Sequence, residues 1–373
     1  MGLRDFARTV DNLYVARHAG RRPRKTLVVI VGNGTHRIAN ILNDRDVEIE
    51  AKKRGYRPGS KKFREFRWRL FEYARYFTSY GLPTLAHVAV YQLVADEVCR
   101  DVVTTNYDLI LDAVWAKYPE LGVAQNPTLR AGQYDWEKYY SPSSLAHRRP
   151  RYWKIHGSLS HIIFVGKRNP ERYQVHRLPR FPISTNQPDL AAYYKMSTLA
   201  PFLGYESQDN PLTAIAHPRE LHPAFQPFID WTLGNVRKPF EQEISMVRRL
   251  LRDVDRIAGV LILGWRGGYD SSNPKDPWNE ELVPSMMDII DKRSVPIMMA
   301  VHREQFAQRH LSSSELLRRM KSLDCCFVYS RVQQFVTALF HDCCRHFPFP
   351  KLTRTHEIWA NNWFLPMKER FHA

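Results

Sequence analysis

The chain contains 373 residues, of which 55 are Lys or Arg and 38 are Asp or Glu, so its formal net charge is +17. At roughly 150 residues per domain, this length predicts two domains or one large domain with insertions. Hydrophobic residues make up 44% of the chain and aromatic residues 12%, which excludes a mainly disordered protein. The longest apolar runs, such as Thr26–Val31 and Val260–Trp265, are far shorter than the ~20 residues that span a bilayer. We therefore predict no transmembrane helix and no membrane partner.

The five cysteines lie at position 99 and in two adjacent pairs, at 325–326 and 343–344, with no C-x-x-C spacing. They are too few for a disulfide framework and do not fit a zinc ribbon, so we predict a reducing compartment, the cytoplasm, and no metal site. Residues 1–25 are basic but contain Asp5 and Asp11 and lack a continuous apolar core. This pattern predicts an exposed N-terminal arm, with a mitochondrial presequence as the alternative.

Positive charge gathers in short clusters, and the most suggestive stretch is Ser60–Phe77. There Phe63, Phe66, Leu70 and Phe77 recur at near-helical spacing, with Lys and Arg side chains between them. The spacing predicts an amphipathic helix with a basic outer face. Such a face is either a solvated surface or a docking surface for nucleic acid or an acidic partner.

Short apolar runs with β-branched residues alternate with helical patterns along the chain. The predicted strands are Thr26–Val31, Asp101–Asn106, Tyr152–Gly157, Val260–Trp265, Pro296–Val301 and Cys325–Ser330. The predicted helices include Thr84–Arg100, Leu109–Lys117, Phe240–Ile257, Glu280–Asp291 and Arg331–Phe347. The alternation predicts an α/β fold with a doubly wound, mostly parallel, Rossmann-like six-stranded sheet.

Two stretches interrupt this alternation. Residues 44–80 read as a charged helical insertion, and residues 158–238 are rich in Pro and Tyr with irregular spacing. Long irregular stretches in compact domains are usually functional, so we expect the second insertion to form a small cap over the sheet edge. One core domain would then cover residues 26–347, followed by a tail at 348–373.

The carboxyl ends of parallel strands meet at one sheet edge, where ligands bind. Gly32, Asn33, Gly34 and Thr35 follow the first strand and precede a predicted helix at Arg37–Leu42. Two readings fit them equally, an ordinary tight turn and a phosphate cradle at a helix N-terminus. The third glycine of the dinucleotide fingerprint is absent.

Polar side chains also follow the second and third strands. Thr105, Asn106 and Asp108 close the second strand, where Asn106 and Asp108 either face a ligand or cap the next helix. His156 and Gly157 close the third strand. His156 reads as a catalytic or a structural histidine, and Gly157 allows a ligand to approach closely.

The fourth strand ends in a glycine-rich segment that contains Gly264, Arg266 and Asp270. These residues suit a loop around a phosphorylated ligand, although a plain flexible loop has a similar composition.

Four motifs in this order resemble the sirtuin-like NAD-binding domain, and in particular its divergent bacterial branch. They are Gly32-Asn33-Gly34-Thr35, Thr104-Thr105-Asn106-Tyr107-Asp108, Lys154-Ile155-His156-Gly157-Ser158 and Leu263-Gly264-Trp265. Asn33 departs from the G-A-G pattern of the family. Sirtuin deacylases carry a four-cysteine zinc module after the catalytic histidine, whereas residues 157–238 contain no cysteine. The resemblance therefore implies the activity of the zinc-free members, which hydrolyse NAD in antiphage defence.

The resemblance also implies roles for the residues at the sheet edge. NAD, as the substrate, would place its pyrophosphate at Gly32–Thr35 and its nicotinamide ribose beside Asn106 and Asp108. Asn106 would orient the attacking water or the ribose, and His156 would act as the general base. Thr105 and Gly157 would also contact NAD. Gly264, Arg266 and Asp270 would contact its adenosine half.

The family resemblance implies a homo-oligomer, often with a second defence component such as a DNA-translocating ATPase. The basic surface would suit docking to that partner or to DNA. Two other functions use the same pocket. One is an NAD-dependent ADP-ribosyltransferase or deacylase, and the other is a non-catalytic scaffold that senses NAD or ADP-ribose.

Overall fold

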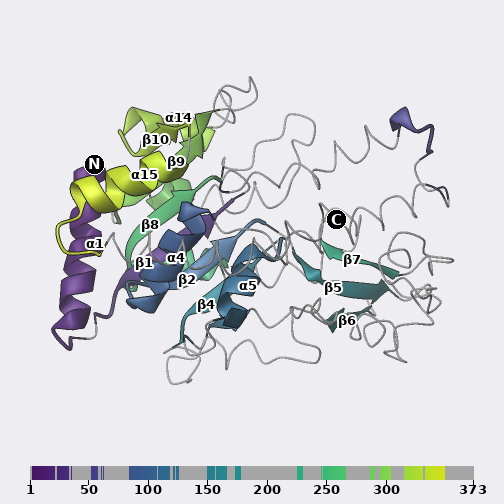
Figure 1. The fold of residues 1–373 in the computed structure, drawn as a ribbon, viewed down its shortest axis with the longest axis horizontal. Coiled ribbons are helices and arrows are strands. Elements are labelled where there is room, and N and C mark those ends of the chain that lie inside the picture. Colours follow the sequence, from purple (N-terminus) through teal and green to yellow (C-terminus); the bar gives the residue numbers. More distant parts are fainter. Residues whose placement is uncertain are drawn as a thin grey trace, which may run out of the picture.

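The computed structural model contains a seven-stranded parallel sheet with the strand order β10-β9-β8-β1-β2-β4-β3 (Figure 1). It describes residues 2–21, 23–32, 35, 52–57, 60, 62, 84–106, 108–117, 121, 123–125, 149–155, 157–165, 173–177, 225–229, 245, 247–265, 286–289, 295–303, 315–330 and 332–348. The strands are β1 (Thr26–Val31), β2 (Cys99–Thr104), β3 (Ala124–Gln125), β4 (Arg151–Lys154), β8 (Ile257–Leu263), β9 (Ile297–His302) and β10 (Cys326–Tyr329).

The predicted α/β, doubly wound, parallel architecture is confirmed. All six predicted strands are present, and β1 has the predicted bounds. The seventh strand, β3, has two residues at the edge beside β4, which is too short for hydrophobic periodicity to reveal.

β1 lies at the centre of the sheet, and all six of its residues are buried. Leu27, Val29 and Val31 pack into the core on one face of the sheet. Val28 and Ile30 pack into the core on the other face. A strand covered on both faces has no solvated side, which explains its continuous apolar sequence.

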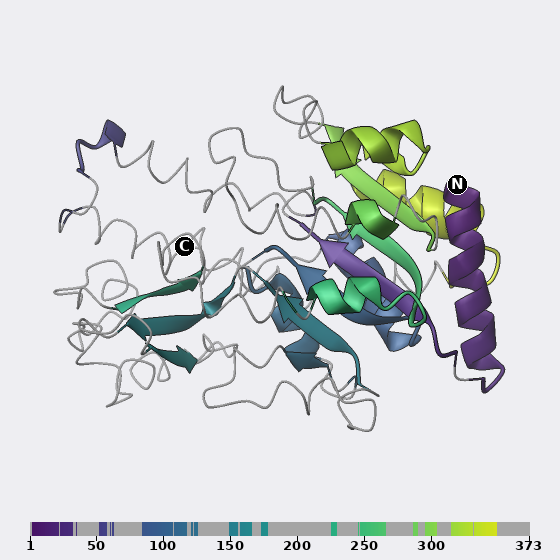
Figure 2. The ribbon, with the colours of Figure 1, turned by 180° about the vertical axis from the view of Figure 1, so that it is seen from behind.

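Helices cover both faces of the sheet, as Figures 1 and 2 show from opposite sides. One core contains side chains of α1 (Leu3–His18), α4 (Leu85–Ala95), α5 (Ile110–Lys117), α15 (Val332–Val336) and the π-helix η7 (Thr337–Cys343). The other core contains side chains of α14 (Glu315–Ser322) and of helical residues 247–252 and 286–289. This arrangement makes the fold doubly wound.

The N-terminal segment is not the exposed arm that its charge predicts, because it forms the helix α1. Phe6, Val10 and Leu13 lie on one face of α1 and are buried, and α1 contacts β8, β9 and η7. Asp11 is also buried, and its carboxylate accepts the backbone N–H groups of residues 345–347 at 2.6, 2.9 and 3.0 Å. Arg4, Arg8 and His18 are exposed, whereas the side chain of Arg17 is mostly buried. The apolar spacing decides where the segment lies.

The helix predicted for Thr84–Arg100 ends earlier, at Ala95. Glu97 has a φ of 54°, a left-handed conformation that no α-helix continues through. The chain turns there, and β2 begins at Cys99. The C-terminal helix likewise ends at Cys343 rather than at the predicted Phe347.

A smaller antiparallel sheet with the order β6-β5-β7 lies within the predicted second insertion. Its strands are β5 (Gly157–Val165), β6 (Tyr173–Arg177) and β7 (Phe225–Ile229), and β5 begins three residues after β4 ends. Its role as a cap stays a prediction. The insertion at 44–80 lies outside the described residues except for 52–57, 60 and 62, and so does the tail beyond Pro348.

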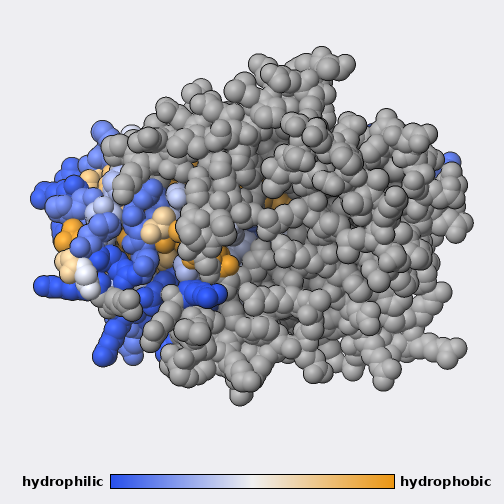
Figure 3. Space-filling view, turned by 60° about the horizontal axis from the view of Figure 1, so that its bottom comes forward, coloured by the Kyte–Doolittle hydropathy of each residue, from blue (hydrophilic) through white to orange (hydrophobic). Residues whose placement is uncertain are grey.

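On the face shown in Figure 3, the described residues are mostly hydrophilic, with scattered apolar side chains. Within that part, the large apolar side chains that are exposed belong to Val15 and Val328, at 44% and 40%. In the same residues, no helix combines the length and the apolarity needed to cross a bilayer.

Candidate functional site

The candidate site lies at the carboxyl ends of β1, β2 and β8. After β1 the chain adds β2 and β4 on one side of the sheet, and later adds β8, β9 and β10 on the other. The strand order therefore reverses between β1 and β8. In doubly wound folds, ligands bind at the carboxyl edge beside this reversal.

Gly32 follows β1 directly and lies against the end of β8. Its N–H donates to the carbonyl of Leu263 at 2.8 Å. A Cβ at this position would lie 2.5 Å from Cα of Trp265 and 2.7 Å from the carbonyl oxygen of Gly264. Gly264 itself has a φ of 66°. The close approach of two strand-end segments therefore requires a glycine at position 32, independently of any bound phosphate.

The turn after β1 is tied to the start of α4. The hydroxyl of Thr35 donates to the carbonyl of Gly32 at 2.8 Å, and the hydroxyl of Thr84 donates to the carbonyl of Thr35 at 2.8 Å. The N–H of Thr84 donates to Nδ1 of His87 at 3.0 Å. The sequence analysis missed Thr84 and His87 as members of this site. A threonine directly before an apolar helical pattern is typical of a helix N-cap and was the available signal.

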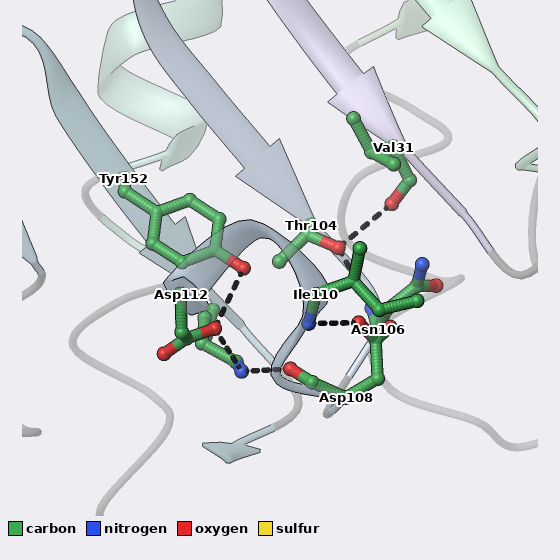
Figure 4. A network of polar contacts seen from close by, with 8 residues as sticks. Val31, Thr104, Asn106, Asp108, Ile110, Asp112 and Tyr152 are labelled. Atoms are coloured by element: carbon green, nitrogen blue, oxygen red, sulfur yellow. Dashed lines mark hydrogen bonds and ion pairs between the residues drawn. The ribbon is translucent and has the colours of Figure 1, made fainter. Parts of the chain in front are cut away.

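Thr104, the last residue of β2, fixes the backbone that carries Asn106 (Figure 4). Its hydroxyl donates to the carbonyl of Val31 at 3.0 Å and accepts the N–H of Asn106 at 3.0 Å. The N–H of Thr105 also donates to Val31, at 3.1 Å. Asn106 leaves the strand ladder here, which explains why β2 ends two residues earlier than predicted. Its side chain is buried, with 4% of the residue exposed.

Asp108 begins the helix that follows. Its Oδ1 accepts the N–H of Ile110, the first residue of α5, at 2.9 Å, and the residue is buried. The helix-cap interpretation of Asp108 is therefore observed. A carboxylate at this position also interacts favourably with the positive end of the helix dipole.

Lys154, the last residue of β4, has a fully buried side chain. Its ammonium group donates to Asp112 Oδ2 at 2.8 Å and to the carbonyl oxygen of Asp108. The hydroxyl of Tyr152 donates to the same Asp112 oxygen at 3.2 Å. Burial, followed by the negative charges of Asp112 and Asp108, raises the pKa of Tyr152 well above its ordinary value.

A second buried ion pair joins β2 and β4 at their amino ends. Arg151 donates to the two carboxylate oxygens of Asp101 at 2.6 and 2.7 Å, and the two residues are register partners. Nε1 of Trp153 donates to Asp101 at 3.1 Å. This cluster lies at the end of the strands away from the candidate site.

The structure brings one part of the predicted site together and leaves the rest as predictions. Gly32, Thr35, Thr105, Asn106, Asp108 and Gly264 all lie at the carboxyl ends of β1, β2 and β8. Gly157 is the first residue of β5 and pairs with Ile229. The other predicted members fall outside the described residues: Asn33, Gly34, His156, Arg266 and Asp270. Among the described residues, no three His, Cys, Asp or Glu side chains are grouped to hold a metal ion.

Several solved sirtuin structures resemble the chain weakly. One concerns the structural basis of sirtuin substrate affinity (13% identity, TM-score 0.42, covering 85% of this chain and 93% of that one). Another is Sir2Tm bound to a propionylated peptide (12% identity, TM-score 0.42, covering 85% and 92%). A third is a complex of a Sir2 homologue with NAD (14% identity, TM-score 0.37, covering 80% and 90%).

Comparison at the level of sequence is more specific. No curated protein matches the chain. Residues 100–219, however, match the family model of the SIR2-like domain. The matched segment begins in β2 and includes β4, and therefore contains Asn106, Asp108 and Lys154. Residues 100–219 are thus a segment similar to the SIR2-like domain.

Proposed function

We propose that the protein is an NAD glycohydrolase that cleaves NAD into nicotinamide and ADP-ribose. The observation that carries the proposal is the buried Asn106, held by Thr104 at the carboxyl end of β2 inside the SIR2-like segment. The site lies beside the reversal of the strand order, which is the usual place for a nucleotide in such folds. A side-chain amide fixed in this way suits the orientation of a ribose or of a water molecule.

In the proposed reaction, the bond between C1′ of the ribose and the nicotinamide nitrogen breaks, and nicotinamide leaves with the bonding electrons. A water oxygen forms the new bond to C1′, and its proton passes to His156 and then to solvent. A histidine suits this role because its ordinary pKa is ~6.5. Asn106 orients the water or the ribose, and Asp108 lines the ribose side of the pocket. The transition state carries positive charge on the ribose, which fixed side-chain dipoles stabilise.

Hydrolysis is favoured over deacylation by the composition of the second insertion. Residues 157–238 contain no cysteine, so they cannot supply the four cysteine ligands of the sirtuin zinc module. The motif resemblance further supports a biological role as an antiphage effector that depletes NAD when triggered. That role includes a homo-oligomer and a defence partner, such as a DNA-translocating ATPase, as components of the proposal.

The test is NAD consumption by the purified wild type, Asn106→Ala and His156→Ala, with the products separated by chromatography. Asn12→Ala, at an exposed position of α1, is the matched control. We expect nicotinamide and ADP-ribose from the wild type and the control. We expect a loss of about 10²-fold or more in both site variants, as for other general-base and positioning groups.

Melting temperatures measured alongside separate loss of activity from loss of folding. Full activity in folded Asn106→Ala would contradict the proposal. So would a wild type that binds NAD without releasing nicotinamide, because that result describes a sensor. Modified protein or acyl-ADP-ribose in place of free ADP-ribose would assign the pocket to group transfer.

A further inference from the structure

Among the described residues near the site, Lys154 has the most deeply buried charged side chain, and the proposed reaction does not use it. The residue is 1% exposed, and its side chain is 0% exposed. A buried ammonium group is expensive unless it is paired and hydrogen-bonded. A lysine at the end of a fully buried strand therefore needs a specific reason.

Two hydrogen-bond partners of Lys154 lie on one short segment that follows Asn106. The ammonium group contacts the backbone carbonyl of Asp108 before α5 and the carboxylate of Asp112 in its first turn. It thereby connects the end of β4 to two points of the segment 108–112. Lys154 also precedes His156 by two positions in the chain.

Lys154 and Thr104 are register partners in the parallel pair of β2 and β4. Between the end of β2 and the start of α5, Thr104 holds the first part of the chain, because its hydroxyl accepts the N–H of Asn106 at 3.0 Å. Lys154 holds the last part of this connection, because its ammonium group donates to the carbonyl of Asp108. Two adjacent strand ends therefore fix the loop that carries Asn106 from both sides.

We infer that Lys154 is a positioning residue, whose ammonium group holds the backbone at Asp108 and hence sets the placement of Asn106 and Asp108. The inference rests on the proposed function, because it assigns to that site the group that holds it in place. Lys154 contacts neither water nor ribose in this role. It acts on the reaction through the backbone of Asp108.

A positioning role and a purely structural role make different predictions for the same substitutions. Lys154→Met keeps the volume of the side chain but leaves the Asp112 carboxylate, whose side chain is 14% exposed, without its ammonium partner. Adding Asp112→Asn removes that charge and keeps an oxygen that can accept the Tyr152 hydroxyl. Replacement of both members of a buried ion pair is often neutral for stability. The double variant therefore separates stability from the positioning of the loop.

The experiment compares the wild type, Lys154→Met and Lys154→Met/Asp112→Asn by melting temperature, by the kcat and KM of nicotinamide release, and by amide hydrogen exchange. The matched control is Arg151→Met/Asp101→Asn, which changes the ion pair at the other end of the same two strands. We expect Lys154→Met to melt about 5–10 °C lower. The double variant should regain most of this loss.

The double variant should nevertheless keep a kcat that is about 10–100-fold below the wild type, with KM nearly unchanged, because small misplacements of a catalytic group have effects of this size. Its amide exchange should accelerate at residues 105–110 and remain as in the wild type in β8. The control variant should keep the wild-type kcat. Recovery of kcat together with stability would overturn the inference and leave the proposed function intact.

If the double variant does not fold, Asp112→Asn alone is the second test. It weakens the anchor of the ammonium group and should lower kcat about 3–10-fold with faster exchange at 105–110, since hydrogen bonds between charged groups are about twice as strong as neutral ones. Unchanged kcat and exchange in this variant would overturn the inference. A wild type that releases no nicotinamide would overturn the proposed function, and the inference with it.

Discussion

The two ends of the β2–β4 pair use the same chemistry for different purposes. At the amino ends, Asp101 and Arg151 form a buried ion pair between two residues that face each other in the sheet. At the carboxyl ends, Lys154 forms a buried ion pair with Asp112, which belongs to the next helix. The first pair ties a strand to a strand, whereas the second ties a strand to a loop and a helix.

The difference shows how the place of the partner in the chain decides what a buried charge does. A pair within the sheet fixes register, which the apolar side chains of both strands already favour. An ion pair between a strand and a residue outside the sheet fixes loop backbone, whose conformation hydrophobic packing does not specify. Replacing one member of the first pair should therefore lower stability alone, and replacing one member of the second should lower both stability and activity.

The largest expected effect is that of Arg151→Met, which leaves the Asp101 carboxylate buried beside Trp153. We expect a loss of about 3–5 kcal/mol in the free energy of unfolding, because a buried charge has lost its partner. Urea unfolding measures this loss. Nicotinamide release per folded molecule should stay at the wild-type value. A specific loss of turnover in this variant would break the distinction between the two ends.

Gly32→Ala tests how tightly the carboxyl edge is packed. The added methyl group meets the backbone of Gly264 and Trp265 at 2.5–2.7 Å, so the end of β1 or of β8 has to move. We expect a loss of about 1–3 kcal/mol in unfolding free energy, the usual range for an overpacked site. Gly2→Ala is the control, because a Cβ there meets nothing within 4 Å. Equal stability of the two variants would contradict the close approach of the segments.

Asp108→Asn separates the two roles of that side chain. Asparagine caps helices about as well as aspartate, so the unfolding free energy should change by less than about 0.5 kcal/mol. Turnover of NAD should nevertheless fall about 10-fold, because the proposed ribose site loses a negative charge while the cap remains. Wild-type turnover would assign Asp108 to helix capping alone. Asp108→Ala, which removes the cap as well, is the comparison variant.

Tyr152→Phe should have the smallest effect, about 1 kcal/mol at pH 8, for the loss of one hydrogen bond to Asp112. Because burial raises the pKa of Tyr152, the folded state keeps this proton above pH ~10, where the unfolded chain releases it. The stability contributed by the hydroxyl is therefore complete below that pH and declines as the pH rises further. Unfolding of both proteins between pH 8 and 11 measures the narrowing difference. A difference that widens above pH 10 would contradict the burial of the hydroxyl.

The strands of the large sheet could be predicted from the sequence because local hydrophobicity specifies a strand buried on both faces. The bounds of β1 show this most clearly. The charge of residues 1–25 predicts an exposed arm, whereas the spacing of Phe6, Val10 and Leu13 specifies a helix that packs on the sheet. That spacing of four and three residues is an ordinary amphipathic pattern and was available.

The candidate site could be predicted only where residues directly follow strands. Asn106 and Asp108 lie at the sheet edge as expected, because parallel strands place their carboxyl ends together. The requirement for a glycine at position 32 could not be predicted from the adjacent sequence. It depends on contact with Trp265, which lies more than two hundred positions away in the chain. Lys154 left a usable signal. A lysine inside a strand that is otherwise buried requires a paired partner.

The hydrogen bonds from residues 345–347 to the Asp11 carboxylate have a consequence for folding during synthesis on the ribosome. At about 5–20 residues per second, the amides that Asp11 binds are synthesised about 20–70 s after the helix that carries it. During this interval, Phe6, Val10 and Leu13 have no completed core to enter. Helix α1 is thus among the last of the described elements to dock, and a chaperone that binds amphipathic segments would find it exposed until residues 345–347 are made.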